Sequence, residues 1–299
     1  MIEPSPTHLT SHPEAVSAPQ LGWWLLVRRA LARQPLLGPS LTFIVLSAVV
    51  GAGAPSLQAW GWLRDPTVFL DYQPHLPPST DFWMGTTSLG HDVWARVLFG
   101  ARAAWQTILA GTSLALVLGI PLGLLSGYSG GWVDRVLVFA MDTIYTLPGL
   151  LLAIVVSFVL GPGIGTAAVA VAIAYSPLYF RVLRSQTASL KSRGYVEAAI
   201  AAGAPSVRVL TRHIFPNVLP SLPVLLTLNA ADAILITAAL GFLGLGLPED
   251  IPEWGRDLRL ALEAFSTGEG IWWTAVFPGL AIALSVTALS WVGDALTDD

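Results

Sequence analysis

Charged side chains are scarce in this sequence: Lys, Arg, Asp and Glu together make up 11% of its 299 residues. A soluble domain carries roughly 25% of these residues, so a water-soluble fold of this length could not cover its surface. Cysteine is absent, which excludes disulfides, thiolate metal sites and cysteine nucleophiles. Lysine occurs once, at Lys191, and no glycine-rich phosphate-binding loop precedes it. The chain therefore has no nucleotide site of the P-loop type.

Motifs of metal and nucleic-acid chemistry are missing as well. The sequence has no H-E-x-x-H motif and no paired-histidine metal spacing, and its five histidines are scattered along the chain. A net charge of −4 gives no signal for binding a polyanion. We therefore expect no catalytic residues, no metal site, no cofactor bound by this chain and no nucleic-acid partner.

Long apolar stretches make up most of the chain. The 30 residues between Arg33 and Arg64 carry no charge, and neither do those between Arg102 and Asp134. A helix needs about 20 apolar residues to cross a bilayer. The sequence therefore predicts an all-α polytopic membrane protein with six transmembrane helices, near residues 36–58, 104–126, 136–160, 164–180, 219–245 and 271–293.

The distribution of Lys and Arg predicts an orientation, because cytoplasmic segments carry an excess of them. With both termini placed inside (N-in, C-in), ten cationic residues lie inside and five outside. The outside set includes Arg96 and Arg102, which we assign to a structured external segment. The ten inside residues are Arg28, Arg29, Arg33, Arg135, Arg181, Arg184, Lys191, Arg193, Arg208 and Arg212.

The remaining segments complete the predicted organisation. Residues 1–20 are expected to be a flexible tail, and the Trp-, Leu- and Arg-containing stretch 21–35 an interfacial helix. The aromatic- and proline-rich stretch 59–102 is expected to form an extracytoplasmic insert. Trp254, Trp272 and Trp273 are expected to be interfacial anchors. Residues 103–295 would form a five-helix core with a cytoplasmic loop at 181–218.

The loop 181–218 is the most informative stretch. It carries six cationic residues against the single Glu197. The sequence predicts a helix over 187–202, a turn at Gly203 and a second helix that starts at Pro205 and ends before Pro216. A rigid elbow of this kind could transmit force to the membrane helices, whereas a solvated basic loop that only obeys the charge rule could not.

This loop resembles the EAA loop of ABC-importer permeases, which in that family docks in a groove of a cytoplasmic ATPase. The resemblance rests on Glu197-Ala198-Ala199, Gly203 and Ile214-Phe215-Pro216. It implies a type I ABC-importer permease fold and assigns coupling to the ATPase to Tyr195, Glu197, Ala198, Ala199, Gly203, Ala204, Pro205, Arg212, His213 and Pro216, with Asn217 also on a family position.

Two further segments narrow the resemblance to the second permease subunit of dipeptide, oligopeptide and nickel systems. Residues 84–93 are similar to a G-T-D-x-x-G-R-D segment of that subfamily, and residues 240–255 are similar to its S-F-L-G-L-G and P-x-W-G segments. Thr87, His91 and Thr237 depart from the usual Asp, Arg and Glu. These departures predict altered contacts in the external segment and at the end of the fifth span.

The resemblance implies a pore subunit and no enzyme. The chain would form half of a translocation pore, with a second homologous permease as the other half. Two cytoplasmic ATPase subunits would bind ATP and Mg, and an extracytoplasmic binding protein would deliver the solute. The implied location is the bacterial cytoplasmic (inner) membrane. The solute would be a peptide by subfamily analogy; nickel chelates, glutathione and another small solute stay open as alternatives.

Polar residues inside the predicted spans have two interpretations. Asp232 lies in the middle of the fifth span with Asn229 one turn away. An acid at that depth faces a cavity or a partner, so it either lines the translocation path or bonds a neighbouring helix. Asp142 is expected to pair with Arg135. Gly119, Gly123 and Gly127 recur every four residues, which predicts close helix packing.

Two other function classes compete with an importer subunit. A stand-alone secondary transporter or channel would need several buried ionisable groups and inverted repeats; the spans hold only Asp142 and Asp232, and no repeat is visible. An intramembrane enzyme would need a nucleophile–base pair or a metal. Co-purification of an ATPase would separate an importer subunit from both.

Overall fold

The computed structural model describes residues 34–68, 72–266 and 271–297. Apart from one isolated bridge between Thr86 and Asp92, the described regular structure is helical. The predicted tail 1–20 and nearly all of the predicted interfacial helix 21–35 lie outside the described residues. The helices are α2 Leu37–Ala59, α3 Val93–Ser129, α4 Gly131–Tyr145, α5 Gly149–Leu160, α6 Ile164–Lys191, α7 Gly194–Ala201, α8 Ser206–Arg208, the π-helix η1 Val209–Ile214, α9 Phe215–Val218, the 3₁₀-helix η2 Leu219–Ser221, α10 Leu222–Phe242, α11 Trp254–Ser266 and α12 Trp272–Thr297.

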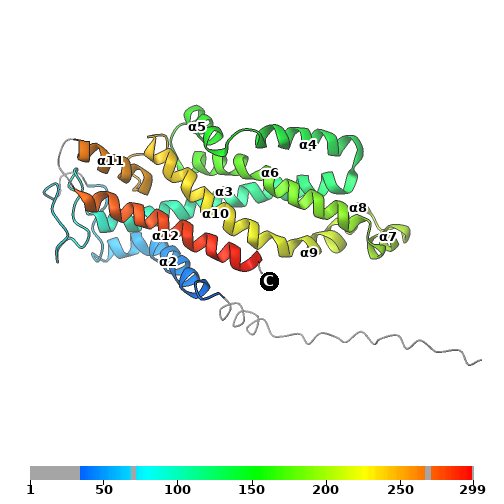
Figure 1. The fold of residues 1–299 in the computed structure, drawn as a ribbon, viewed down its shortest axis with the longest axis horizontal. Coiled ribbons are helices and arrows are strands. Elements are labelled where there is room, and N and C mark those ends of the chain that lie inside the picture. Colours follow the sequence, from blue (N-terminus) through cyan, green and yellow to red (C-terminus); the bar gives the residue numbers. More distant parts are fainter. Residues whose placement is uncertain (1–33, 69–71, 267–270, 298–299) are drawn as a thin grey trace, which may run out of the picture.

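Five helical stretches are long and apolar enough to cross a membrane: α2, α3, α6, α12 and the continuous stretch 206–242 that ends in α10. Their long axes run roughly along the length of the molecule, with α11 at one end and α7 at the other (Figure 1). The chain enters α2 and leaves α12 on the side away from α11 (Figure 1). The six predicted spans thus correspond to these five stretches and one further candidate.

The sixth candidate is a pair of helices rather than one straight span. Residues 136–160 were expected to form a single helix, but α4 and α5 meet at an angle of 87°. The bend lies at Pro148, which is the N-cap of α5 and has an extended ψ of 127°. Because proline disfavours the α conformation in the residue before it and lacks an N–H donor, the helix breaks there. In Figure 1, α4 lies along α6 while α5 turns across the bundle.

The core of the bundle is the packing of α3 against α6. A Cβ on Gly119 would come within 2.6 Å of the Tyr179 Cβ, and one on Gly123 within 2.8 Å of the Leu183 Cβ. A Cβ on Gly127 would overlap Thr187 at 2.7 Å. The predicted ridge of small residues is therefore confirmed, since only glycine lets the two backbones approach this closely.

The insert predicted over 59–102 is shorter than expected, because α3 already begins at Val93. Asp92 is its N-cap, and the Asp92 carboxylate accepts a hydrogen bond from the Trp94 N–H at 3.0 Å. A side-chain oxygen of this kind satisfies a donor that the first helical turn would leave unpaired. Residues 93–102 thus lengthen the second span at the α11 end.

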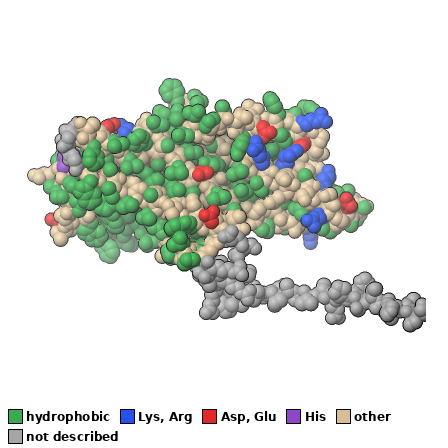
Figure 2. Space-filling model, in the orientation of Figure 1, with side chains coloured by type: hydrophobic (Ala, Val, Ile, Leu, Met, Phe, Trp, Pro, Cys, Tyr) green, Lys and Arg blue, Asp and Glu red, His purple; other side chains and the backbone are tan. Residues whose placement is uncertain are grey.

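The surface differs along the length of the molecule. Most of the Lys and Arg side chains visible in Figure 2 gather at the α7 end, while hydrophobic side chains cover the middle and much of the α11 end. Among the described residues many large apolar side chains are exposed, including Val45 and Val49 of α2 and Phe158 of α5. An exposed apolar middle with cationic side chains gathered at one end is typical of the surface of a membrane-embedded bundle.

Candidate functional site

Residues 192–218, which make up most of the connection between α6 and α10, form a compact elbow around α7. Gly203 has a φ of +81° at the end of α7. Its N–H donates to the Ile200 carbonyl at 2.9 Å, and the Ala204 N–H donates to the Ala199 carbonyl at 3.1 Å. These two bonds and the left-handed glycine make a Schellman motif, so the turn predicted at Gly203 has a defined geometry.

The elbow is anchored on one side and open on the other. Its anchor consists of four aliphatic side chains with no exposed surface: Val196, Val209, Ile214 and Val218. On the open side, Tyr195 is 47% exposed, Ile200 40% and Val207 71%. A rigid turn that presents uncovered apolar side chains is a surface for another protein.

All ten residues predicted to couple the chain to an ATPase lie in this elbow. The more exposed ones are Tyr195, Glu197, Ala198, Gly203, Pro205, Arg212 and Pro216. Ala199, Ala204 and His213 are half-buried.

Two predictions about where the helices of the elbow begin and end were wrong. Pro205 is the N-cap of α8, with an extended ψ of 147°, rather than its first helical residue. The helix predicted over 187–202 is divided, because α6 ends at Lys191 and α7 begins at Gly194.

The second helix of the elbow does not end before Pro216 as expected. Pro216 lies in the first turn of α9, where its missing N–H costs no hydrogen bond. The preceding turn, η1, is a π-helix, and the Asn217 side-chain amide donates to the His213 carbonyl at 2.7 Å. The helical path from Ser206 to Phe242 is therefore continuous, so that a displacement of the elbow would reach α10 directly.

The two polar residues predicted in the fifth span lie in different environments. Asn229 is 1% exposed, whereas Asp232 is exposed. Tyr175 of α6 lies beside Asp232, and Tyr179 lies beside Asn229. Among the described residues, the Tyr179 hydroxyl and the Asn229 amide nitrogen are buried without a hydrogen-bond partner. The sequence gave no reason to select either tyrosine. Their spacing of one helical turn on α6 is the signal that pairs them with Asn229 and Asp232 on α10.

Two ion pairs join α4 to α6 toward the α7 end. The Arg184 Nη2 contacts the Asp134 Oδ2 at 2.7 Å, and the Arg181 Nη2 contacts the Asp142 Oδ1 at 2.8 Å. The predicted pair between Asp142 and Arg135 is therefore wrong. Asp142 pairs with Arg181 on the neighbouring helix α6 instead of with Arg135 on its own helix.

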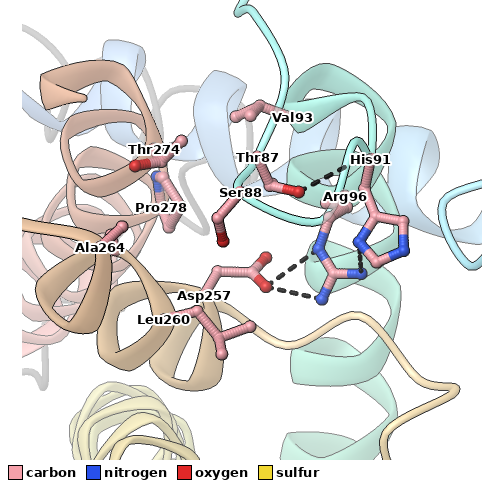
Figure 3. Close-up of a pocket in the computed structure, with 11 residues that line it drawn as sticks. Thr87, Ser88, His91, Val93, Arg96, Asp257, Leu260, Ala264, Thr274 and Pro278 are labelled. Atoms are coloured by element: carbon pink, nitrogen blue, oxygen red, sulfur yellow. Dashed lines mark hydrogen bonds and ion pairs between the residues drawn. The ribbon is translucent and has the colours of Figure 1, made fainter. Parts of the chain in front are cut away.

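At the α11 end, a buried ion pair connects α3 to α11 (Figure 3). The Arg96 Nη2 lies 2.6 Å from the Asp257 Oδ1, and these side chains are 4% and 5% exposed. Arg96 also donates to the Pro66 carbonyl at 3.0 Å. Removal of one partner would leave the other as an unpaired buried charge, which would strongly destabilise the fold. Arg96 thus lies in the first turn of α3, so the separate external segment to which the sequence analysis assigned Arg96 and Arg102 is wrong: both residues belong to the lengthened second span.

His91 lies against this pair, with its Nδ1 3.5 Å from the Arg96 Nη1 (Figure 3). Burial of the imidazole, and secondly the Arg96 guanidinium, lower the pKa of His91 to about 4. Thr87 holds the same loop, because its hydroxyl accepts the His91 N–H at 3.1 Å. The two departures from the subfamily pattern at Thr87 and His91 therefore sit together beside Arg96.

Trp254 and Glu253 close the α11 end from the other side. Trp254 was expected to be an interfacial anchor, but it is 5% exposed and donates to the Val97 carbonyl at 3.0 Å. Glu253 accepts the Gly255 N–H at 2.8 Å and the Arg256 N–H at 3.0 Å. Burial raises the pKa of Glu253 to about 7. These residues fix α11 on the bundle.

With this geometry established, comparison with known proteins gives the family. Residues 119–298 match the family described as "Binding-protein-dependent transport system inner membrane component". The chain belongs to this family of ABC-importer permeases. It is a multi-pass membrane protein.

Several relatives of the permease are similar over most of their length. The dipeptide transport system permease protein DppC of Alkalihalophilus pseudofirmus is 38% identical over 221 residues, covering 74% of this chain and 72% of that one. The glutathione transport system permease protein GsiD of Pectobacterium atrosepticum is 34% identical over 286 residues, or 95% and 91% of the two chains. A Brucella suis relative named as a peptide transport system permease protein is 35% identical over 296 residues, or 98% and 96%.

The fold has a counterpart among solved structures. An inward-facing structure of the MetNI methionine ABC transporter matches the permease with a TM-score of 0.52 and 18% identity, over 67% of this chain and 93% of that one. At this identity the match shows the fold alone. It places the helical bundle in the architecture of ABC-importer permeases.

Proposed function

We propose that the chain forms half of the translocation pore of an ATP-driven, binding-protein-dependent importer of peptides, and that the elbow docks on a cytoplasmic ATPase. The observation that carries the proposal is the elbow itself. It combines a fixed Schellman turn at Gly203, a buried aliphatic anchor and exposed apolar side chains at Tyr195 and Val207. A surface that must transmit force needs both rigidity and an uncovered face.

The α7 end faces the cytoplasm in this proposal. Lys and Arg side chains gather there (Figure 2), and the positive-inside rule assigns such segments to the cytoplasmic side. The side on which the chain enters α2 and leaves α12 is the one away from α11 (Figure 1), which supports the N-in, C-in orientation. The membrane is the bacterial cytoplasmic membrane, in keeping with the family's description as an inner membrane component.

A subunit that forms half of a pore needs partner subunits to complete the importer. A second homologous permease supplies the other half, two ATPase subunits bind ATP and Mg, and an extracytoplasmic binding protein delivers the solute at the α11 end. This chain carries no P-loop, so ATP hydrolysis belongs to the partner subunits. ATP-driven closure of the ATPase dimer would displace α7, and the continuous helix 206–242 would carry the displacement into the pore.

The solute is a peptide in this proposal, in keeping with relatives named for dipeptide and peptide transport. Glutathione, a tripeptide, is the second candidate, because a relative that covers 95% of this chain carries that name. Asp232, with Tyr175 beside it, would line the translocation path, whereas Asn229, which the sequence analysis grouped with it, is buried in the bundle. The Asp232 carboxylate could meet the ammonium group of a passing peptide.

A substitution at Gly203 tests the coupling role. Gly203→Val forces a β-branched residue into a φ of +81°, although nothing lies within 4 Å of its Cβ position. We expect the solute to stimulate ATP hydrolysis much less in the reconstituted Gly203→Val importer. We also expect this variant to lose ATP-driven uptake of a labelled dipeptide. The measurement compares hydrolysis and uptake in the same vesicles.

Gly161 provides a matched control for that test. It has the same φ of +81° and the same free space around its Cβ position, but it lies in the turn between α5 and α6, outside the elbow. Because Gly161 also has a ψ of 172°, in a region that essentially only glycine enters, Gly161→Val should cost at least as much backbone strain as Gly203→Val and still leave coupling intact. Full coupling in the Gly203 variant, or equal uncoupling in both, would remove the elbow from the mechanism.

A further inference from the structure

An elongated apolar groove of about 640 Å³ runs between α2, α3 and α12 at the α11 end of the molecule. One stripe of each helix lines it: Leu46 and Val50 of α2, Val97 and Ala101 of α3, and Ala281 and Leu284 of α12. Each pair is spaced by three or four residues, so that each helix presents one face to the groove. The groove is thus built mainly by the bundle, and the segment between α2 and α3 adds Trp62, Leu63, Trp83 and Met84 at one end.

The chemistry of the groove excludes a polar ligand. Its lining side chains are apolar except for Ser47, Ser285 and the indole N–H groups of tryptophans. The Ser47 hydroxyl is already engaged, since it accepts from the Trp105 Nε1 at 3.2 Å and donates to the Ile44 carbonyl at 2.9 Å. No lining side chain is charged. An occupant would therefore be held by apolar contact alone.

The position of the groove matches one leaflet of a bilayer. From Phe43 to Leu57, both of which line it, α2 rises by about 21 Å, which is more than half of a hydrocarbon core of about 30 Å. Trp62 and Trp83 lie at the α11 end of the groove and are 81% and 66% exposed. Exposed tryptophans mark the level of the lipid headgroups.

The groove is also continuous with the lipid-facing surface. Val45, Leu46 and Val49 of α2 are each more than half exposed, and in a membrane protein such a face meets hydrocarbon. Leu46 belongs both to this face and to the groove. An acyl chain can therefore enter sideways without leaving the hydrocarbon.

The chain's own remaining residues are poor candidates for the occupant. Residues 1–33 join α2 at the end opposite to the groove, and to reach it they would have to carry Arg28, Arg29 and Arg33 along an apolar face. The gap at 267–270, Thr-Gly-Glu-Gly, has no apolar side chain. The hydrocarbon that borders the groove matches its chemistry better than either of these two segments.

We propose that the groove binds one acyl chain of a phospholipid from the leaflet at the α11 end. The acyl chain would pack on Trp254. This residue lines the groove, and its indole N–H donates to the Val97 carbonyl. Because Trp254 begins α11, the bound lipid stabilises the contact between α3 and α11. This inference rests on the membrane location of the protein and is independent of the coupling role of the elbow.

Photolabelling in a defined bilayer tests the proposal. The purified importer complex is reconstituted into discs of phosphatidylethanolamine and phosphatidylglycerol with a tracer phosphatidylcholine that carries a diazirine in its acyl chain. After irradiation, adducts should concentrate on Val50 and Ala281, which line the groove, over Val49, which is exposed on the same helix but lies outside it.

Variants whose larger side chains fill the groove provide a second test. Val50→Trp and Ala281→Trp should each abolish most groove adducts, whereas the adjacent control Val49→Trp should leave them unchanged. Equal labelling of Val49 and Val50 would overturn the proposal, as would groove adducts that persist in both filled variants. Cross-linking of groove residues to a helix of the partner permease would assign the groove to a protein interface instead. If either filled variant fails to assemble, the other variant and the wild-type pattern still decide.

Discussion

Asp232 and Asn229 show how strongly the environment of a single residue depends on helix rotation. They lie three positions apart on α10, yet Asn229 is buried against α6 while Asp232 is exposed in the middle of an apolar helix. A carboxylate facing hydrocarbon would cost several kcal/mol. We therefore expect the exposed face of Asp232 to meet the pore or the partner permease.

Neutralising Asp232 tests this assignment. Asp232→Asn keeps the size of the side chain but removes the charge that would attract a peptide ammonium group. We expect uptake of a labelled dipeptide to fall by about tenfold, equivalent to about 1.4 kcal/mol. The matched control is Asp294→Asn, which removes an exposed acid near the end of α12. Unchanged uptake in an assembled Asp232 variant would remove this residue from the path.

His91 makes the α11 end sensitive to acid. Its folded pKa of about 4 lies below the value of about 6.5 for an unfolded histidine. The unfolded chain therefore takes up a proton at a higher pH than the folded one, and stability is lost as the pH falls from about 6.5 to about 4. The loss attributable to this group is at most about 3 kcal/mol.

Replacing His91 should flatten that pH dependence. We expect the apparent melting temperature of the wild-type complex to drop more steeply between pH 7 and pH 4.5 (about the titration window) than that of a His91→Gln complex. Asp65, Arg96 and Asp257 are the charged groups that act on the imidazole, and all three remain in the variant. Parallel curves for the two proteins would contradict the account.

At the scale of elements, the bent pair α4–α5 departs most from a simple bundle. Its angle of 87° is held on one side by two links to α6. The Asp134 carboxylate contacts Arg184 and also accepts the Ser126 hydroxyl. The Asp142 carboxylate contacts Arg181, whose guanidinium lies 4.0 Å from the centre of the Tyr145 ring. These links hold α4 alongside α6 while α5 turns away.

The two links should differ in strength. Asp134 and Arg184 are 20% and 39% exposed, whereas Asp142 and Arg181 are 47% and 44% exposed. Solvent screens the second pair more, so Asp142→Asn should cost a few tenths of a kcal/mol and Asp134→Asn about 1 kcal/mol. The decrease in apparent melting temperature of each complex measures this. A larger effect at Asp142 would show that exposure does not set the contribution.

Sequence periodicity and composition identified the elements well where a local signal exists. Charge-free stretches located the spans, and Gly203 marked the turn of the elbow. The four-residue spacing of Gly119, Gly123 and Gly127 predicted a close helix contact, and the structure shows that α6 is the partner. The break at Pro148 was harder, because a proline inside an apolar run fits both a kinked span and two separate helices. The prediction that a helix ends before Pro216 was wrong because proline is tolerated in a first helical turn as well as after a helix.

At the scale of the whole molecule, contacts between distant segments could not be predicted. Arg96 and Asp257 are separated by 161 positions, and no local pattern in either segment names the other as partner. The same holds for Tyr175 and Asp232, which meet only when α6 packs on α10. The elbow residues could be selected from sequence because they lie within one continuous stretch and carry a family motif.

The molecule as a whole has two unlike ends. At the α7 end, cationic side chains surround an anchored elbow with an exposed apolar face. At the α11 end, a buried ion pair and Trp254 fix an amphipathic helix over the bundle. Such a division fits a pore subunit that receives force on one side of the membrane and solute on the other.

Site-directed cross-linking tests the central proposal, that the elbow is the docking surface for the ATPase. Because the chain contains no cysteine, Ala198→Cys on α7 and Leu262→Cys on α11 each introduce a single thiol at an exposed position. Each purified complex is labelled with a maleimide benzophenone, irradiated and analysed by mass. We expect the thiol at position 198 to yield an adduct with the ATPase subunit and the thiol at position 262 to yield none. An ATPase adduct at position 262 without one at position 198 would contradict the account.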